Sequence, residues 1–309
     1  MNGILDDFKN AFRKPNNGLI QIILINVIVF LVLAALRLTL RWTLGTDPNS
    51  VMDPEPYYYH DITKNLFLSS RIPTALVKPW TLVTYFFSHE GIFHILWNML
   101  FLYWFGKLIE EYLGNRRLIN LYLLGGLAAG ISYLLIYNLI PNFRPAIGTP
   151  LLGASGAVYA VVVGAATLMP NYTFFMLLLG PVRIKYIAAF FLVSSFVDLS
   201  NDANPGGNIA HLGGALLGFF FITQLKKGND IGKPLTGVAE WLKRLFQPKP
   251  KLKVTHRSPV RNGQAVSTPH AIPNQDEIDA ILDKISRSGY DSLTKEEKQK
   301  LFRASQKNN

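Results

Sequence analysis

Six long apolar segments limit the folds open to this chain. They lie near residues 19–41, 80–105, 117–139, 151–169, 184–199 and 207–225. About 20 apolar residues in a helix cross the ~30 Å hydrocarbon core of a bilayer. The chain is 49% hydrophobic and only 17% charged, whereas soluble domains average about 25% charged residues. The sequence therefore predicts an all-α membrane protein with six transmembrane helices, the fifth of them short or tilted.

Lysine and arginine residues predict the orientation of these helices. They gather in the arm 1–18, in the connections after the second and fourth segments, and after residue 225, whereas the opposite side is poorer in them. The positive-inside rule then puts both termini in the cytoplasm, which agrees with six crossings. The first segment, Leu19 to Leu36, is longer than a signal-peptide core, so we expect a retained helix.

The polar parts of the chain predict four regions. Residues 1–18 form a cytoplasmic arm, and 19–225 form the six-helix domain with an external loop at 43–79. Residues 226–273 read as a basic, Pro-rich linker. Residues 274–306 read as a small two-helix cytoplasmic unit. In that unit Asn274 caps the first helix, Gly289 ends it, and Thr294 with Glu297 forms a capping box for the second.

The net charge of +11 comes mainly from one stretch. Residues 226–261 carry ten Lys or Arg and two acidic residues, directly after the last apolar segment. Such a cluster is typical of a cytoplasmic membrane face that attracts anionic lipid. No DNA or RNA motif accompanies it, so the prediction is a lipid contact at 226–261 and no nucleic-acid partner.

Several kinds of catalytic chemistry are excluded or disfavoured by the residues present. There is no cysteine, which excludes disulfides, a cysteine nucleophile and cysteine zinc sites. In "HEGIFH", His89 and His94 are five residues apart, whereas a zinc helix needs histidines at i and i+4. Aspartyl chemistry needs acids in two helices, and only Asp198 lies near one. We expect neither a metal nor a cofactor.

Polar groups at membrane depth point to a site. They are His94 and Asn98 in the second segment, Ser155 in the fourth and His211 in the sixth. His94 and Asn98, at i and i+4, share one helix face. Each has a purely structural reading: a serine hydroxyl bonds back to its own helix, and a buried histidine is satisfied in a core. However, polar groups inside a membrane are costly and mark function by default.

Topology brings these residues to one level. All lie on even-numbered helices, and Ser155 and His211 are each four residues into their segments. His94 and Asn98 join that layer if the second helix begins late, near Ser88. A serine beside a histidine with two side-chain donors is a nucleophilic hydrolase arrangement. No carboxylate lies at this depth, so a dyad is favoured over a triad.

The motifs "HILWNM", "GASGAVYA" and "AHLGGALLG" resemble the three signatures of the rhomboid intramembrane serine proteases. The resemblance covers about residues 15–225 and implies a six-helix rhomboid core in a bacterial inner membrane. It implies substrates that are transmembrane helices, cut near the outer face, with the short fifth helix and the loop after it as a mobile gate.

The same resemblance implies a role for each site residue. Ser155 would be the nucleophile and His211 the general base. The oxyanion hole would consist of His94, Asn98 and the Ser155 backbone N–H. The supporting residues would be Tyr159, which packs on the His211 ring, and Gly153 and Gly156, which allow a close helix start. Glu110 would be a structural acid, and Gly214 with Gly218 would pack the sixth helix on the fourth.

Two rival functions remain open. Some rhomboid-like proteins lack the dyad and only bind or escort membrane helices; the presence of both Ser155 and His211 argues against that reading here. A transporter also places polar groups inside the membrane, but its sites lie near the midplane between repeat-related helices. No internal repeat occurs in this sequence.

Overall fold

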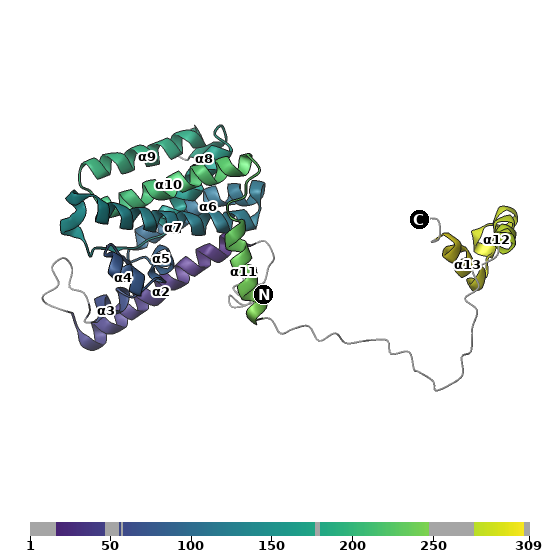
Figure 1. Cartoon of the computed structure of the whole chain (residues 1–309), viewed down its shortest axis with the longest axis horizontal. Coiled ribbons are helices and arrows are strands. Elements are labelled where there is room, and N and C mark those ends of the chain that lie inside the picture. Colours follow the sequence, from purple (N-terminus) through teal and green to yellow (C-terminus); the bar gives the residue numbers. More distant parts are fainter. Residues whose placement is uncertain (1–16, 47–55, 57, 177–179, 247–274, 306–309) are drawn as a thin grey trace. The chain divides into compact units, whose positions relative to one another are not determined.

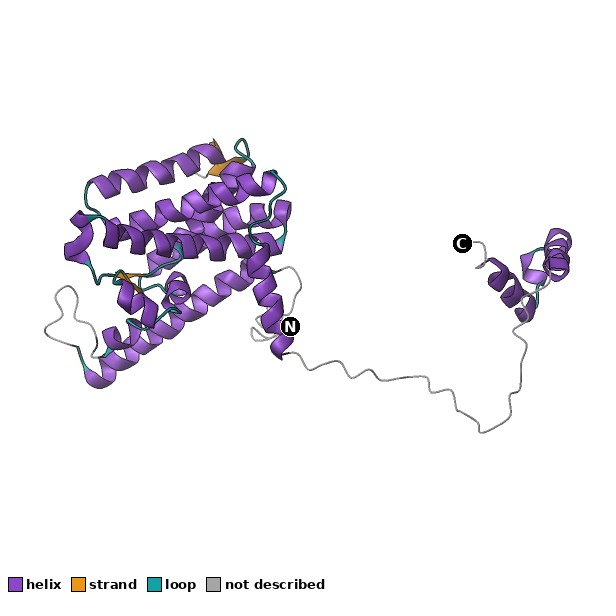
Figure 2. Ribbon diagram, viewed as in Figure 1, coloured by secondary structure: helices purple, strands orange, loops and turns teal. Residues whose placement is uncertain are grey.

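The computed structural model describes residues 17–46, 56, 58–176, 180–246 and 275–305. The chain divides into two compact units, Met1–Gln247 and Pro248–Asn309. The described residues are mostly helical in both units (Figure 2). The predicted arm 1–18 lies almost wholly outside them.

Four described helices are long and apolar enough to cross a membrane: α2 (Gly18–Leu44), α6 (Ile92–Leu113), α7 (Asn115–Leu139) and α10 (Pro205–Lys226). α8 (Ser155–Leu168) is apolar but shorter, and α9 (Ile184–Ser200) has 17 residues. The chain is thus an all-α, multi-pass membrane protein. Six crossings stay a prediction.

α8 packs among the other long helices of the first unit, next to α9 and α10 (Figure 1). It contacts α6, α7, α9 and α10, and it is buried along most of its length. Small residues let its neighbours come close: the positions where Cβ atoms on Gly125 and Gly156 would lie are occupied by Ala160 and Ala129. Lipid tails are as apolar as leucine, so close packing rather than expulsion from water holds such helices together.

The second apolar segment does not form one helix from residue 80. The chain makes α5 (Thr81–Thr84) and the short 3₁₀ helix η1 (Tyr85–Phe87), turns through extended residues, and begins α6 only at Ile92. Side chains explain the early stop. The indole N–H of Trp80 donates to the Asn65 carbonyl at 2.8 Å, and the Tyr85 hydroxyl donates to the Gly126 carbonyl at 2.6 Å.

The predicted external loop contains short ordered elements. They are α3 (Tyr59–Thr63), β1 (Leu68–Ser69) and α4 (Ile72–Val77). β1 pairs antiparallel with β2 (Pro150–Leu151), which follows η2 (Pro141–Ala146). A second two-stranded ladder joins β3 (Thr173–Met176) to β4 (Gly180–Arg183). The β1–β2 pairing fixes the chain just before α8.

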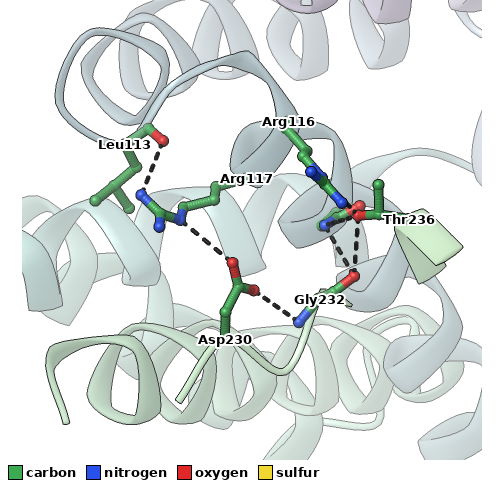
Figure 3. A network of polar contacts seen from close by, with 7 residues as sticks. Leu113, Arg116, Arg117, Asp230, Gly232 and Thr236 are labelled. Carbon is green, nitrogen blue, oxygen red and sulfur yellow. Dashed lines mark hydrogen bonds and ion pairs between the residues drawn. The ribbon is translucent and has the colours of Figure 1, made fainter. Parts of the chain in front are cut away.

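The interpretation of 226–273 as a linker is wrong for its first part. Residues Lys233–Phe246 form helix α11, which is packed on the start of α7. Its anchors are polar (Figure 3): Arg117 Nε lies 3.4 Å from Asp230 Oδ2, and the Arg116 Nε–H donates to the Thr236 hydroxyl at 3.0 Å. The Asn120 side-chain amide donates to the Gly232 carbonyl at 3.0 Å. The rest of the predicted linker, 247–273, lies outside the described residues.

The second unit contains α12 (Gln275–Ser288), the 3₁₀ turn η3 (Tyr290–Ser292) and α13 (Lys295–Ser305). The predicted stop is confirmed, because Gly289 has φ +74° and directly follows α12. The predicted capping box is confirmed as well: the Thr294 N–H donates to Glu297 Oε2 at 2.7 Å, and the Glu297 N–H donates to Thr294 Oγ1 at 3.3 Å. These bonds, after the stronger one from Lys284 at 2.9 Å, hold the pKa of Glu297 down at about 2. The predicted Asn274 cap lies outside the described residues.

Candidate active site

Ser155 is the first residue of α8, and its backbone is fixed from both sides. The preceding Gly153 has φ +108°, and its N–H donates to the Tyr85 carbonyl at 3.0 Å. A Cβ on Gly153 would lie 2.6 Å from the His94 ring. Only glycine combines that φ with that contact. The N–H of a first helical residue has no carbonyl partner within its helix, so that of Ser155 is well placed to meet an anion.

The Ser155 hydroxyl meets His211, which α10 supplies. The distance between Ser155 Oγ and His211 Nε2 is 2.8 Å, across 56 residues of sequence. α10 reaches α8 through glycines: a Cβ on Gly214 would overlap the Gly156 carbonyl, and one on Gly218 would overlap the Ala160 carbonyl. The glycine spacing on α10 therefore sets the distance between the two reactive side chains.

The His211 ring is held in one orientation. Tyr159 stacks on it with ring centroids 4.2 Å apart and planes 10° apart. The other ring nitrogen, Nδ1, lies 3.4 Å from the hydroxyl of Ser195, which in turn lies 3.0 Å from the Tyr159 hydroxyl. If Nδ1–H donates to Ser195, then Nε2 is the nitrogen that accepts the Ser155 proton.

Sequence reasoning assigned no role to Ser195. Its side chain is 1% exposed on α9, whereas the neighbouring Ser194 only bonds back to the carbonyls of its own helix. The available signal was a pair of hydroxyls in the apolar run "FLVSSFV". Helical spacing alone does not tell which of the two faces the histidine.

His94 and Asn98 lie on α6 and line the same cavity as Ser155 and His211. This cavity has a volume of about 330 Å3, and its walls are mostly aromatic and aliphatic side chains. The Asn98 amide nitrogen donates to the His94 carbonyl at 2.8 Å, and the Asn98 side chain is largely buried. The structure thus brings all four polar residues of the predicted layer together.

The helix starts behind this layer differ from the expected ones. Ser155 is the first residue of α8 rather than four residues into its segment, and His211 is the seventh residue of α10. α10 begins early because Asn204 caps it, accepting from the Gly207 N–H at 3.2 Å. The condition that the second helix begins late, near Ser88, is met, since α6 begins four residues later still, at Ile92.

A third histidine, His89, supports the backbone beside the nucleophile. Its Nε2 accepts from the Ala154 N–H at 3.2 Å. The residue is fully buried, and burial, together with nearby His94, lowers its pKa to about 3. Neutral His89 therefore holds the turn that presents Ser155. In the sequence, the only signal for this role of His89 was its position five residues before His94.

Other predicted supports lie where helices meet. The Glu110 carboxylate accepts from the Leu19 N–H at 3.4 Å, so it serves the first turn of α2. Within the described residues, no group of three or more His, Asp or Glu side chains is arranged to hold a metal ion.

Comparison with known proteins gives two matches to family models. Residues 77–227 match the Rhomboid domain, a range that holds every residue of the site above. Residues 272–307 match a family of unknown function, DUF6576. The second match spans the two-helix unit.

Relatives in plants and animals share the first region. The chain is 32% identical to RHOMBOID-like protein 12, mitochondrial, of Arabidopsis thaliana, over 48% of this chain and 47% of that protein. It is 28% identical to Rhomboid-like protein 16, chloroplastic, of the same plant, over 53% and 54%. It is 30% identical to the mouse Presenilin-associated rhomboid-like protein, mitochondrial, over 51% and 40%. The chain spans about half the length of these relatives or less. The Rhomboid model and these relatives together show that residues 77–227 of this chain form a domain of the rhomboid family.

Proposed function

We propose that this chain is an intramembrane serine endopeptidase that cuts transmembrane helices with a Ser155–His211 dyad. The 2.8 Å contact between Ser155 Oγ and His211 Nε2, under a stacked Tyr159 ring, is the observation that carries the proposal. A hydroxyl alone is a poor nucleophile, and an adjacent oriented imidazole activates it.

The proposed reaction begins with proton transfer from Ser155 to His211 Nε2 as Oγ attacks the scissile carbonyl carbon. The tetrahedral intermediate carries an oxyanion, which the Ser155 N–H and the side chains of His94 and Asn98 would stabilise. His211 then protonates the leaving amine, and the peptide C–N bond breaks. Water, deprotonated by His211, hydrolyses the acyl-enzyme and regenerates the serine.

The surroundings support a membrane-embedded substrate. The cavity beside the dyad is walled by Trp97, Phe101 and Phe191, so an apolar segment fits it better than a polar peptide. α9 supplies one wall and also carries exposed Phe190, Val193 and Phe196. We propose that α9 and the loop before α10 move to admit the substrate helix.

The proposal includes six crossings, α2, α6, α7, α8, α9 and α10, with both termini in the cytoplasm and the dyad near the outer face. A bacterial inner membrane remains our prediction for the compartment, although the relatives above are named as mitochondrial or chloroplastic. We also retain the proposal that 226–261 binds anionic lipid.

The test is cleavage of a model transmembrane substrate by the full-length protein in proteoliposomes. Ser155→Ala and His211→Ala should each lower the rate by about 10³-fold or more, as in dyads that act as one unit. Ser194→Ala is the matched control and should cleave like wild type. Equal cleavage by folded Ser155→Ala and wild type would sink the proposal and favour a protein that only binds membrane helices.

A further inference from the structure

A second cavity, with a polar lining, lies beside the last turns of α2. Its volume is about 330 Å3, and its polar lining consists of Arg37, Arg41, Tyr59, His89 and Glu90. Arg37 and Arg41 are one helical turn apart, so both guanidinium groups serve one face of α2. The dyad does not use this cavity.

The same helix face changes from apolar to cationic along its length. Phe30 and Ala34 line the cavity first along the helix, and Arg37, Leu38 and Arg41 line it after them. At 1.5 Å per residue, Phe30 and Arg41 are about 16 Å apart along the helix. That sequence of surfaces matches an amphiphile with a tail beside the phenylalanine and an anionic head beside the arginines.

The charges in the cavity favour a monoanion. Two guanidinium groups and the Glu90 carboxylate sum to one positive charge. A phosphodiester carries one negative charge and two free oxygens, whereas a phosphate monoester or free phosphate carries nearly two charges. Arginine side chains that only extend to the bilayer surface do not line a cavity. The Arg37 guanidinium instead lies over the buried Tyr59 ring, 5.7 Å from its centroid.

We propose that this cavity binds the phosphodiester of a membrane phospholipid through Arg37 and Arg41, with an acyl chain along Phe30 and Ala34. The proposal concerns binding and does not depend on protease activity.

The test uses the full-length protein in detergent, stripped of lipid and then titrated with phosphatidylethanolamine under native mass spectrometry. Arg37→Gln combined with Arg41→Gln should weaken binding at least about tenfold, because charge-assisted hydrogen bonds are lost. Arg144→Gln, an arginine of η2 outside the cavity, should bind like wild type. Diacylglycerol with the same acyl chains should bind wild type at least about tenfold more weakly than the phospholipid.

Three results would overturn the proposal. The first is wild-type affinity in the folded double variant, and the second is equal binding of diacylglycerol. The third is displacement of the lipid by equimolar inorganic phosphate, which would indicate a site for free anions. If the double variant does not fold, Ala34→Trp provides the test. Its side chain fills the apolar wall of the cavity without changing the charge. Undiminished lipid binding by Ala34→Trp would also contradict the proposal.

Discussion

The two ends of α8 differ in how they use polar side chains. At its start, Ser155, His211, Ser195 and Tyr159 form a chain of neutral hydrogen-bonding groups. Beyond its end, where Lys226 donates to the Thr167 carbonyl, α10 leads into the charged contacts of α11. Arg117 and Arg116 pair there with Asp230 and Glu240, with side chains 16% to 62% exposed.

The difference is one of environment. Buried neutral groups must meet at fixed distances, so the first end depends on glycines that let helices touch. Exposed ion pairs tolerate movement and contribute little each. Substitutions at the Ser155 end should therefore have large and specific effects, and those at the α11 end small ones.

The largest effect is expected from Gly214→Val. The new side chain would overlap the Gly156 carbonyl and separate α10 from α8, at a cost of about 3 kcal/mol or more. Both the melting temperature in detergent and cleavage should fall. Gly237→Val is the control, because a Cβ there has open space around it. Equal melting of the two variants would show that the close helix approach does not hold this end together.

Most of the residues at the Ser155 end could be predicted from the sequence. The motifs marked Ser155, His211, His94 and Asn98, because polar groups in apolar segments are rare. The packing of Tyr159 on His211 was implied by the resemblance to the rhomboid family. Ser195 was not predicted, since its role depends on the rotation of α9, which an apolar run leaves undefined.

The other end was harder to predict for a different reason. Residues 233–246 have apolar residues at helical spacing, Leu235, Val238, Leu242 and Leu245, but they begin a basic, Pro-rich stretch whose composition as a whole is that of a linker. Their helix is stabilised by Arg117, Asn120 and Asp230, whose pairing is tertiary. The broken second segment has the same origin, because Trp80 and Tyr85 bond to residues distant in sequence.

Asn98→Ala should slow cleavage by about 10²-fold with little change in melting temperature, as loss of one oxyanion donor does elsewhere. The comparison variant is Asn138→Ala, because Asn138 also bonds to the carbonyl four residues back but joins the loop at Ser70. It should lower the melting temperature and leave the turnover of folded protein unchanged. A wild-type rate for Asn98→Ala would remove this residue from the oxyanion hole.

Ser195→Ala should lower kcat by about two- to tenfold with KM unchanged, because one neutral hydrogen bond that orients His211 is lost. Ser195→Thr retains the hydroxyl and should recover most of the rate. A loss that Thr does not rescue, or an unchanged kcat in Ser195→Ala, would mean that Ser195 does not position the base.

The smallest effect is expected at the α11 end. A double-mutant cycle with Arg117→Gln and Asp230→Asn should give a coupling free energy below about 1 kcal/mol. Salt should reduce it further. Cleavage should stay at the wild-type rate. A coupling free energy of several kcal/mol, measured by unfolding in detergent, would contradict this account, because the contact would then depend on its geometry as strongly as the buried contacts around Ser155.

The central claim is that His211 activates Ser155 as a nucleophile, and covalent labelling tests it most directly. A fluorophosphonate probe, added to the full-length protein in lipid nanodiscs, is attacked by an activated serine with loss of fluoride. Peptide mass spectrometry should place the label on Ser155 in wild type and find almost none in His211→Ala, where Ser155 is still present. Equal labelling of Ser155 in the two proteins, or a label on another serine alone, would contradict the account.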